Sequence, residues 1–167
     1  MTVRNIRSSD PEYFASEEIK QGWPDASSEK LETRLRDNTA GKAVSIAADY
    51  EGEPAGYVSV YPYCMWGALG GKGYPEIVDF NVLEKFRNKG VGTKLMDIAE
   101  QIAAEYSDTV YLGVGLHSGY GAAQRLYVKR GYVPDGSGVW YGGKVCPQYA
   151  ECLNDDDLNL YLYKKLK

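Results

Sequence analysis

The hydrophobic and polar positions of this chain follow two periods, which together predict a mixed α/β protein. Between Gly90 and Tyr106 the large apolar residues recur at spacings of three and four, as on one buried helix face. These residues are Val91, Leu95, Ile98, Ile102 and Tyr106. Residues 109–116 are almost continuously apolar, which favours a strand in the middle of a sheet.

Alternating runs and turn residues predict the remaining elements. Strands are expected over 2–7, 42–50, 54–61, 76–82, from Tyr132 onward and over 157–166. Helices are expected over 11–20 with Asp10 as cap, from Ser27 or Ser28 to Asn38, and over 120–130, closed by Gly131. Glu51-Gly52-Glu53 predicts a tight hairpin turn. The expected order is β-α-α-β-β-β-α-β-α-β-β, an α/β pattern of about seven strands and about four helices.

Composition narrows the classes of function. A chain of 167 residues suits one domain, and no apolar run or leader pattern predicts a membrane partner or secretion. A cytoplasmic location is therefore expected. The net charge of −4 gives no support to a nucleic-acid partner. Cys64, Cys146 and Cys152 lack metal-ligand spacing and His117 is the single histidine, so we expect reduced thiols and no metal.

The junction between the strand over 76–82 and the long helix has the features of an anion site. The first N–H groups of a helix lack intrahelical partners, and the helix dipole adds positive charge there. Gly90 and Gly92 allow a ligand to approach the backbone closely, and Arg87 and Lys89 add charge. Leu95 stands where a dinucleotide fingerprint needs its third glycine. These residues predict a pyrophosphate site, although the glycines could also serve only to make a tight turn.

Two segments in this region together resemble the acetyl-CoA-binding motifs of the GNAT N-acetyltransferase family. The first is Phe80-Asn81-Val82 followed by Arg87-Asn88-Lys89-Gly90-Val91-Gly92. The second runs from Ala122 to Tyr132 and includes Leu126-Tyr127 and Gly131. The resemblance covers residues 76–133, and the start of the second segment is similar to a bacterial subgroup of unassigned substrate. The chain departs from the family pattern at Asn81, where alanine is usual, and at Tyr120, where many relatives carry asparagine.

The resemblance implies a GNAT fold, with a central mixed, mostly antiparallel sheet, a splayed parallel strand pair and flanking helices. It implies one domain over 1–167, with an acceptor side (1–75), an acetyl-CoA-binding core (76–133) and C-terminal strands (134–167). Acetyl-CoA is the implied co-substrate. The residues implied to contact it are Phe80, Asn81, Val82, Arg87, Asn88, Lys89, Gly90, Val91, Gly92, Thr93, Tyr120 and Ala123.

The implied reaction transfers an acetyl group to a primary amine, which needs a base for the ammonium and an acid for the leaving thiolate. The resemblance makes Tyr127 the candidate acid. Glu76 is the candidate base, because strand alternation places it on the same face as Val82. Asp79 is a rival that would need a bulge to reach that face, and water could also remove the proton.

The acceptor could be a small molecule or a protein amine, and its pocket would draw on aromatic residues and one histidine. The candidates are Trp23, Tyr63, Trp66 and His117. An alternative function is a non-catalytic or regulatory acyl-CoA-binding module. GNAT proteins often form homodimers, and the apolar residues of 157–166 are suited to pairing between copies.

Overall fold

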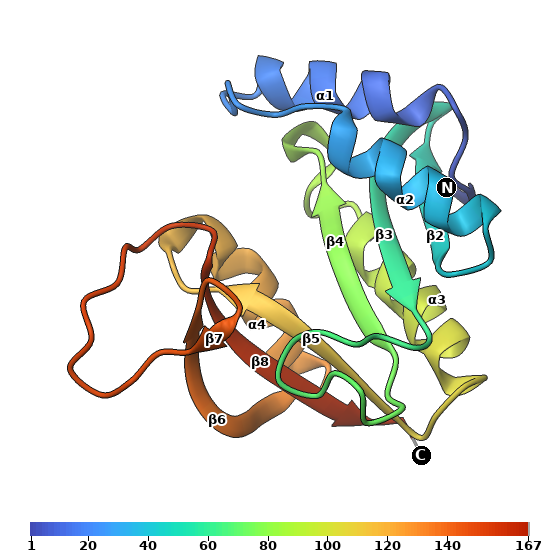
Figure 1. Cartoon of the computed structure of the whole chain (residues 1–167). Coiled ribbons are helices and arrows are strands. Elements are labelled where there is room, and N and C mark those ends of the chain that lie inside the picture. Colours follow the sequence, from blue (N-terminus) through green and yellow to red (C-terminus); the bar gives the residue numbers. More distant parts are fainter. Residues whose placement is uncertain (167) are drawn as a thin grey trace. The chain divides into compact units, whose positions relative to one another are not determined.

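Eight strands of the computed structural model, which describes residues 1–166, are hydrogen-bonded in the order β1-β2-β3-β4-β5-β8-β6-β7. Their bounds are β1 Thr2–Asn5, β2 Val44–Tyr50, β3 Glu53–Tyr61, β4 Glu76–Val82, β5 Thr109–Gly115, β6 Val133–Tyr141, β7 Lys144–Val145 and β8 Leu158–Lys165. The α-helices are α1 Asp10–Lys20, α2 Glu29–Thr39, α3 Val91–Ala104 and α4 Gly121–Lys129. The predicted element order and mixed, mostly antiparallel sheet are confirmed (Figure 1).

The sheet has one strand more than the sequence predicts. β7 is only two residues long and pairs with the end of β6, through Trp140 with Val145 and Tyr141 with Lys144. The intervening Gly142 and Gly143 both have positive φ and make the turn of this short hairpin. Two residues are too few to show an alternating pattern, so the sequence predicts only a loop there.

The chain divides into two compact units, and the first comprises residues 1–61 and 77–102. Within it β1, β2 and β3 are antiparallel, and Figure 1 shows α1 and α2 on one side of the strands and α3 on the other. The predicted turn is confirmed, because Tyr50 pairs with Glu53 across Glu51 and Gly52. Both turn residues have positive φ, the conformation that suits a two-residue hairpin.

Asp10 has a different role from the predicted helix cap. It is the first residue of α1, and Ser9 occupies the cap position without a side-chain hydrogen bond. The Asp10 carboxylate, 1% exposed, accepts hydrogen bonds from the Arg4 guanidinium at 2.7 and 2.9 Å and from the Arg7 N–H at 2.7 Å. An ion pair with an arginine six residues earlier thus fixes the β1–α1 corner, a contact that helix-start patterns do not reveal.

The buried face of α3 includes Val91 and Leu95 of the predicted stripe but extends to a neighbouring row of residues, and Ile98 and Ile102 are only half-buried. Leu95, Met96, Ala99 and Ala103 are fully buried, whereas Tyr106 lies beyond the helix end and is 42% exposed. The prediction counted only large residues at each turn. The two buried alanines show that close packing needs small residues at part of this face.

The second unit comprises residues 62–76 and 103 onward. β8 is antiparallel to both β5 and β6, so both of its edges are hydrogen-bonded within the chain. Glu76 belongs to this unit and pairs in parallel register with Tyr111. No helix in the described part of the chain is long and apolar enough to cross a membrane.

Candidate functional site

The turn before α3 has the geometry of the predicted anion site. The first hydrogen bond that closes this helix end runs from the Lys94 N–H to the Gly90 carbonyl at 3.0 Å, so the preceding N–H groups lie at the open helix terminus. Gly90 has a φ of 80°, and space around its missing Cβ is open. A Cβ on Gly92 would lie 3.0 Å from the end of the Phe80 ring, so a side chain there would require this ring to shift. Gly90 is therefore favoured by backbone conformation and Gly92 by close packing against Phe80.

Charged side chains flank this turn. Arg87, half exposed, pairs with Glu84 at 3.1 Å. The Lys89 ammonium lies over the rings of Tyr50 and Phe86, 5.1 and 5.4 Å from their centroids. Asn88 has a φ of 60°. The segment from Asn88 to Gly90 thus turns the backbone at a place where cationic groups and unpaired N–H donors could hold phosphate oxygens.

Strand β4 is distorted at Asp79, whose φ of 52° is left-handed. The distortion interrupts strand alternation, so the argument that Glu76 and Val82 share a face does not extend across it. The Asp79 carboxylate accepts a short hydrogen bond from Arg34 Nε, and Lys30 lies 3.7 Å away. Two cationic side chains of α2, Arg34 and Lys30, therefore pair with the Asp79 carboxylate.

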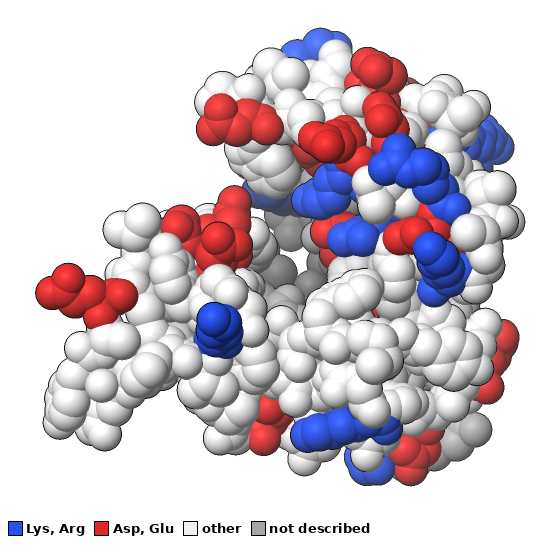
Figure 2. All heavy atoms as spheres, viewed as in Figure 1, with Lys and Arg blue, Asp and Glu red and all other residues white. Residues whose placement is uncertain are grey.

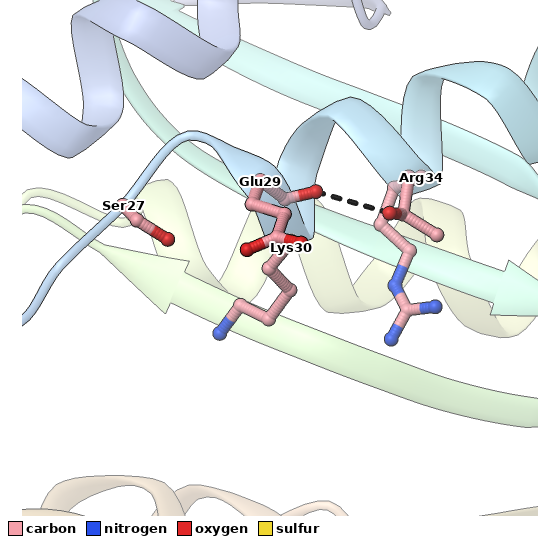
Figure 3. A pocket seen from close by; sticks show the side chains of 5 residues that line it. Ser27, Glu29, Lys30 and Arg34 are labelled. Carbon is pink, nitrogen blue, oxygen red and sulfur yellow. Dashed lines mark hydrogen bonds between the residues drawn. The ribbon is translucent and has the colours of Figure 1, made fainter.

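Arg34 also binds Tyr61, whose hydroxyl lies 2.8 Å from Nη1 and donates to Asp37 at 2.6 Å. Burial, and then the hydrogen bond to Asp37, raises the pKa of Tyr61 to about 12. An open pocket of about 330 Å³ lies along this part of α2. It is lined by Ser27, Glu29, Lys30, Thr33 and Arg34 (Figure 3). Figure 2 shows basic side chains interspersed with acidic ones on this surface.

Glu76, the candidate base, is buried in the second unit with 3% exposure. Its Oε2 accepts a hydrogen bond from the Cys64 thiol at 2.8 Å. The Tyr111 hydroxyl donates to the Trp66 carbonyl at 2.8 Å and anchors the loop that carries Cys64. The sequence did not identify this thiol–carboxylate contact, because it joins a loop residue to a strand twelve positions later.

The Cys64 thiol should be unreactive in the folded protein. Burial, and then the hydrogen bond to Glu76, raises its pKa to about 12, so almost no thiolate is present near neutral pH. We expect iodoacetamide to alkylate the half-buried Cys146 and Cys152 well before Cys64. Mass spectrometry of tryptic peptides measures this, and unfolding in urea should make all three react. Equal rates at the three cysteines in the folded protein would contradict the buried contact.

Tyr127, the candidate acid, lies on α4 and is 5% exposed. Its ring packs against Tyr132 with 5.8 Å between the centroids. Burial, and then the charge of Tyr120, raises the pKa of Tyr127 well above its usual value. The phenol therefore stays protonated across the neutral range, as a proton donor must.

Tyr120 and His117, predicted for different roles, lie side by side at the start of α4. Their ring centroids are 4.7 Å apart, and both bind Asp156 Oδ1, at 2.9 Å from the Tyr120 hydroxyl and 3.0 Å from His117 Nε2. The Gly119 N–H donates to His117 Nδ1 at 3.1 Å, which leaves Nε2 as the donor to the carboxylate. The Tyr120 ring covers Gly115, where a Cβ would come within 2.3 Å of it. Ala123 follows one turn into α4, half-buried.

The aromatic candidates for the acceptor pocket fall in both units. Trp23 lies in the first unit and is 39% exposed, whereas Tyr63 and Trp66 lie in the second at 76% and 49%. The Tyr63 ring packs edge-on against Tyr106 at 5.9 Å. Among residues 1–166, no group of three or more His, Cys, Asp or Glu side chains could hold a metal ion.

The structure adds one cluster that the sequence analysis missed. Glu18 of α1 accepts hydrogen bonds at Oε1 from the Tyr57 hydroxyl at 2.8 Å and from Asn81 Nδ2 at 2.6 Å. The partners are 39 and 63 residues from Glu18 along the chain, so no local pattern could reveal them. The only sequence signal was Asn81 itself, which stands where the resembling motif has alanine.

The chain is similar to known proteins at the level of a family model and of one curated relative. The family model described as Acetyltransferase (GNAT) family matches residues 3–132. An uncharacterized N-acetyltransferase of Chlorobaculum tepidum is 29% identical over 108 residues, which cover 64% of this chain and 64% of that protein's length.

Solved structures show the same fold. A ribosomal-protein-alanine N-acetyltransferase from Brucella melitensis is similar with a TM-score of 0.70 and 16% identity, over 99% of this chain and 100% of that one. The yncA protein of Salmonella typhimurium, solved with its cofactor acetyl-CoA, is similar with a TM-score of 0.69 and 15% identity, over 100% and 94%.

Proposed function

Because this chain belongs to the acetyltransferase (GNAT) family, we propose that it transfers the acetyl group of acetyl-CoA to a primary amine by direct attack on the thioester. The acceptor is a small molecule or an amine of a protein. In this reaction the amine nitrogen forms a bond to the carbonyl carbon and the carbon–sulfur bond breaks. The nitrogen loses two protons, one when the ammonium becomes the free amine and one when the adduct becomes the amide; the departing thiolate takes up one proton and the other is released to solvent.

The turn before α3 is the observation that carries this proposal. Open helix N–H groups, the positive φ of Gly90 and the contact between Gly92 and Phe80 together suit a pyrophosphate held against backbone. Asn88 to Thr93 would supply the N–H donors, with Arg87 and Lys89 adding positive charge. Phe80 and Val82 would bind the pantetheine arm through their backbone groups, and Tyr120 and Ala123 would contact CoA from α4.

Tyr127 is the proposed acid. Its phenol is protonated across the neutral range, as tyrosines ordinarily are, and burial raises its pKa further. A protonated phenol can donate to the leaving thiolate, and the resemblance of the segment around Leu126-Tyr127 to the family motif supports this role.

The base has three candidates. Glu76 is buried, and its Oε2 accepts the hydrogen bond from the Cys64 thiol. Asp79 is ion-paired with Arg34 and Lys30, so its carboxylate oxygens are engaged by α2. Water is the third candidate. We propose Glu76, because both cationic side chains of α2 engage Asp79, the other carboxylate of β4.

A non-catalytic acyl-CoA-binding module is the alternative, and the presence of Tyr127 favours the enzyme. A thiol-release assay distinguishes them: acetyl-CoA is incubated with a panel of primary amines and peptides, and free CoA is detected by a thiol reagent. The proposal expects amine-dependent release of CoA with at least one acceptor. Tight acetyl-CoA binding without release for any amine class would favour the module.

A further inference from the structure

Glu18 is a buried carboxylate without a cationic partner. Three acidic side chains of the described chain are less than a tenth exposed: Asp10, Glu18 and Glu76. Asp10 is paired with Arg4 at 2.7 Å. Glu18, at 8% exposure, has no ion pair with any lysine or arginine among residues 1–166. Burying an unpaired charge costs several kcal/mol, on the order of 3–5, so its presence calls for an explanation.

The two oxygens of Glu18 have different surroundings. Oε1 receives both hydrogen bonds, from the Tyr57 hydroxyl and from Asn81 Nδ2. Oε2 accepts no hydrogen bond from the residues that the structure describes, and it is not among the fully enclosed unpaired atoms, which include Gln21 Nε2 and Asp49 Oδ1. The carboxylate is thus fixed in orientation by one oxygen, and the other keeps a small solvent exposure.

The partners of Glu18 hold it firmly. Burial, and then the negative charge of Glu18, raises the pKa of Tyr57 well above its usual value, so this tyrosine remains a donor. The Phe14 ring packs against Tyr57 at 4.7 Å and closes the apolar side of the cluster. Asn81 lies on β4 between Phe80 and Val82, the residues proposed to bind the pantetheine arm. The carboxylate is therefore bonded to the strand on which the thioester is proposed to lie.

Neighbouring charges do not neutralise this group. Asp79, which also acts electrostatically on Tyr57, is held by Arg34 and Lys30 of α2. Glu17, next to Glu18, turns outward to Lys20 and Lys85 at 2.7 and 2.9 Å. Each of these carboxylates has its own cations, and Glu18 does not.

We infer that Glu18 is the binding residue for the ammonium group of the acceptor, which supplies the missing positive charge through a hydrogen bond to Oε2. The inference rests on the proposed function and makes it more specific. The acceptor is a primary amine that enters as the cation, and neutral alcohols of the same shape bind poorly. Asn81, unusual for the motif, is the positioning residue that holds Glu18 toward β4.

Methylammonium, the fragment shared by aliphatic primary amines, tests the inference whichever amine is the natural acceptor. Titration is followed by NMR at the side-chain amide of Asn81, with methanol as neutral control. We expect a saturable shift with methylammonium and none with methanol. Glu18→Gln keeps an oxygen for Tyr57 and Asn81 but loses the charge, and should weaken methylammonium binding about 10- to 100-fold. Glu17→Gln, which removes a neighbouring paired carboxylate, should change nothing.

The thermal unfolding midpoint of Glu18→Gln shows whether a loss of binding comes from unfolding. We expect the variant to be at least as stable as the wild type, because the substitution removes an unpaired buried charge. No shift at Asn81, or an equal shift in Glu18→Gln, would overturn the inference. Calorimetric titration of the same samples with acetyl-CoA distinguishes failure of the Glu18 inference from failure of the proposed function. If acetyl-CoA binds and methylammonium does not, only the role of Glu18 fails, whereas loss of acetyl-CoA binding in the unmodified protein removes the proposed function itself.

Discussion

Replacing Gly90 or Gly92 by aspartate should abolish acetyl-CoA binding. At Gly90 a side chain must adopt a φ of 80°, which costs an L-residue on the order of 1 kcal/mol or more. At Gly92 the new Cβ would press against the Phe80 ring at 3.0 Å. In both variants a carboxylate also faces the place proposed for the pyrophosphate, where like charges repel.

Two further variants separate these causes. Gly90→Ala adds the backbone strain without the charge and should weaken binding less than Gly90→Asp. Gly41→Asp adds the same side chain at another open position of positive φ, at the end of α2, and should leave binding unchanged. Calorimetric titration gives the acetyl-CoA affinity of the four variants. Wild-type affinity in both Gly90→Asp and Gly92→Asp would contradict the assigned phosphate site.

Tyr127→Phe should lower turnover by about 10²- to 10⁴-fold, because it removes a general acid. Acetyl-CoA affinity should change little, since the phosphate turn lies elsewhere in the chain. Tyr132→Phe is the matched control: it removes a buried hydroxyl from the ring that packs on Tyr127 and should keep most activity. The measurement is the steady-state rate on an acceptor found by the thiol-release screen.

The raised pKa of Tyr127 adds a pH test. An ordinary tyrosine would lose its proton near pH 10. Burial raises the pKa of Tyr127, so the wild-type rate should not fall near pH 10 through deprotonation of this residue.

Unchanged turnover in the Tyr127→Phe variant would contradict the role of Tyr127 as the acid and leave it a packing residue.

Much of the fold follows from local sequence patterns. The turn at Glu51 and Gly52, the buried run of β5 and the glycines before α3 are each specified by residues within a few positions of one another. The motif pair, being local as well, led to the family that the comparison confirms. Local propensity and periodicity were sufficient for these features because neighbouring residues determine them.

The side-chain contacts of the candidate site could not be predicted in this way. Asp10 looked like a helix cap, but Arg4 and the Arg7 N–H provide stronger partners for its carboxylate. The left-handed φ of Asp79 has no signature in the alternation of β4. Glu18 and Asn81 meet across 63 positions, through the packing of a helix on a strand. Such contacts depend on the tertiary arrangement of the elements, which cannot be predicted from the periodicity of the sequence.

Calorimetric titration with acetyl-CoA, repeated with desulfo-CoA and dephospho-CoA, tests the central claim most directly. The account predicts micromolar binding that survives loss of the sulfur, because the pyrophosphate and pantetheine contacts of the α3 turn and β4 provide most of the affinity. Loss of the 3′-phosphate should matter little, because the N–H groups of the α3 turn are proposed to bind the pyrophosphate. Absence of binding to all three ligands at millimolar concentration would contradict the acetyltransferase function.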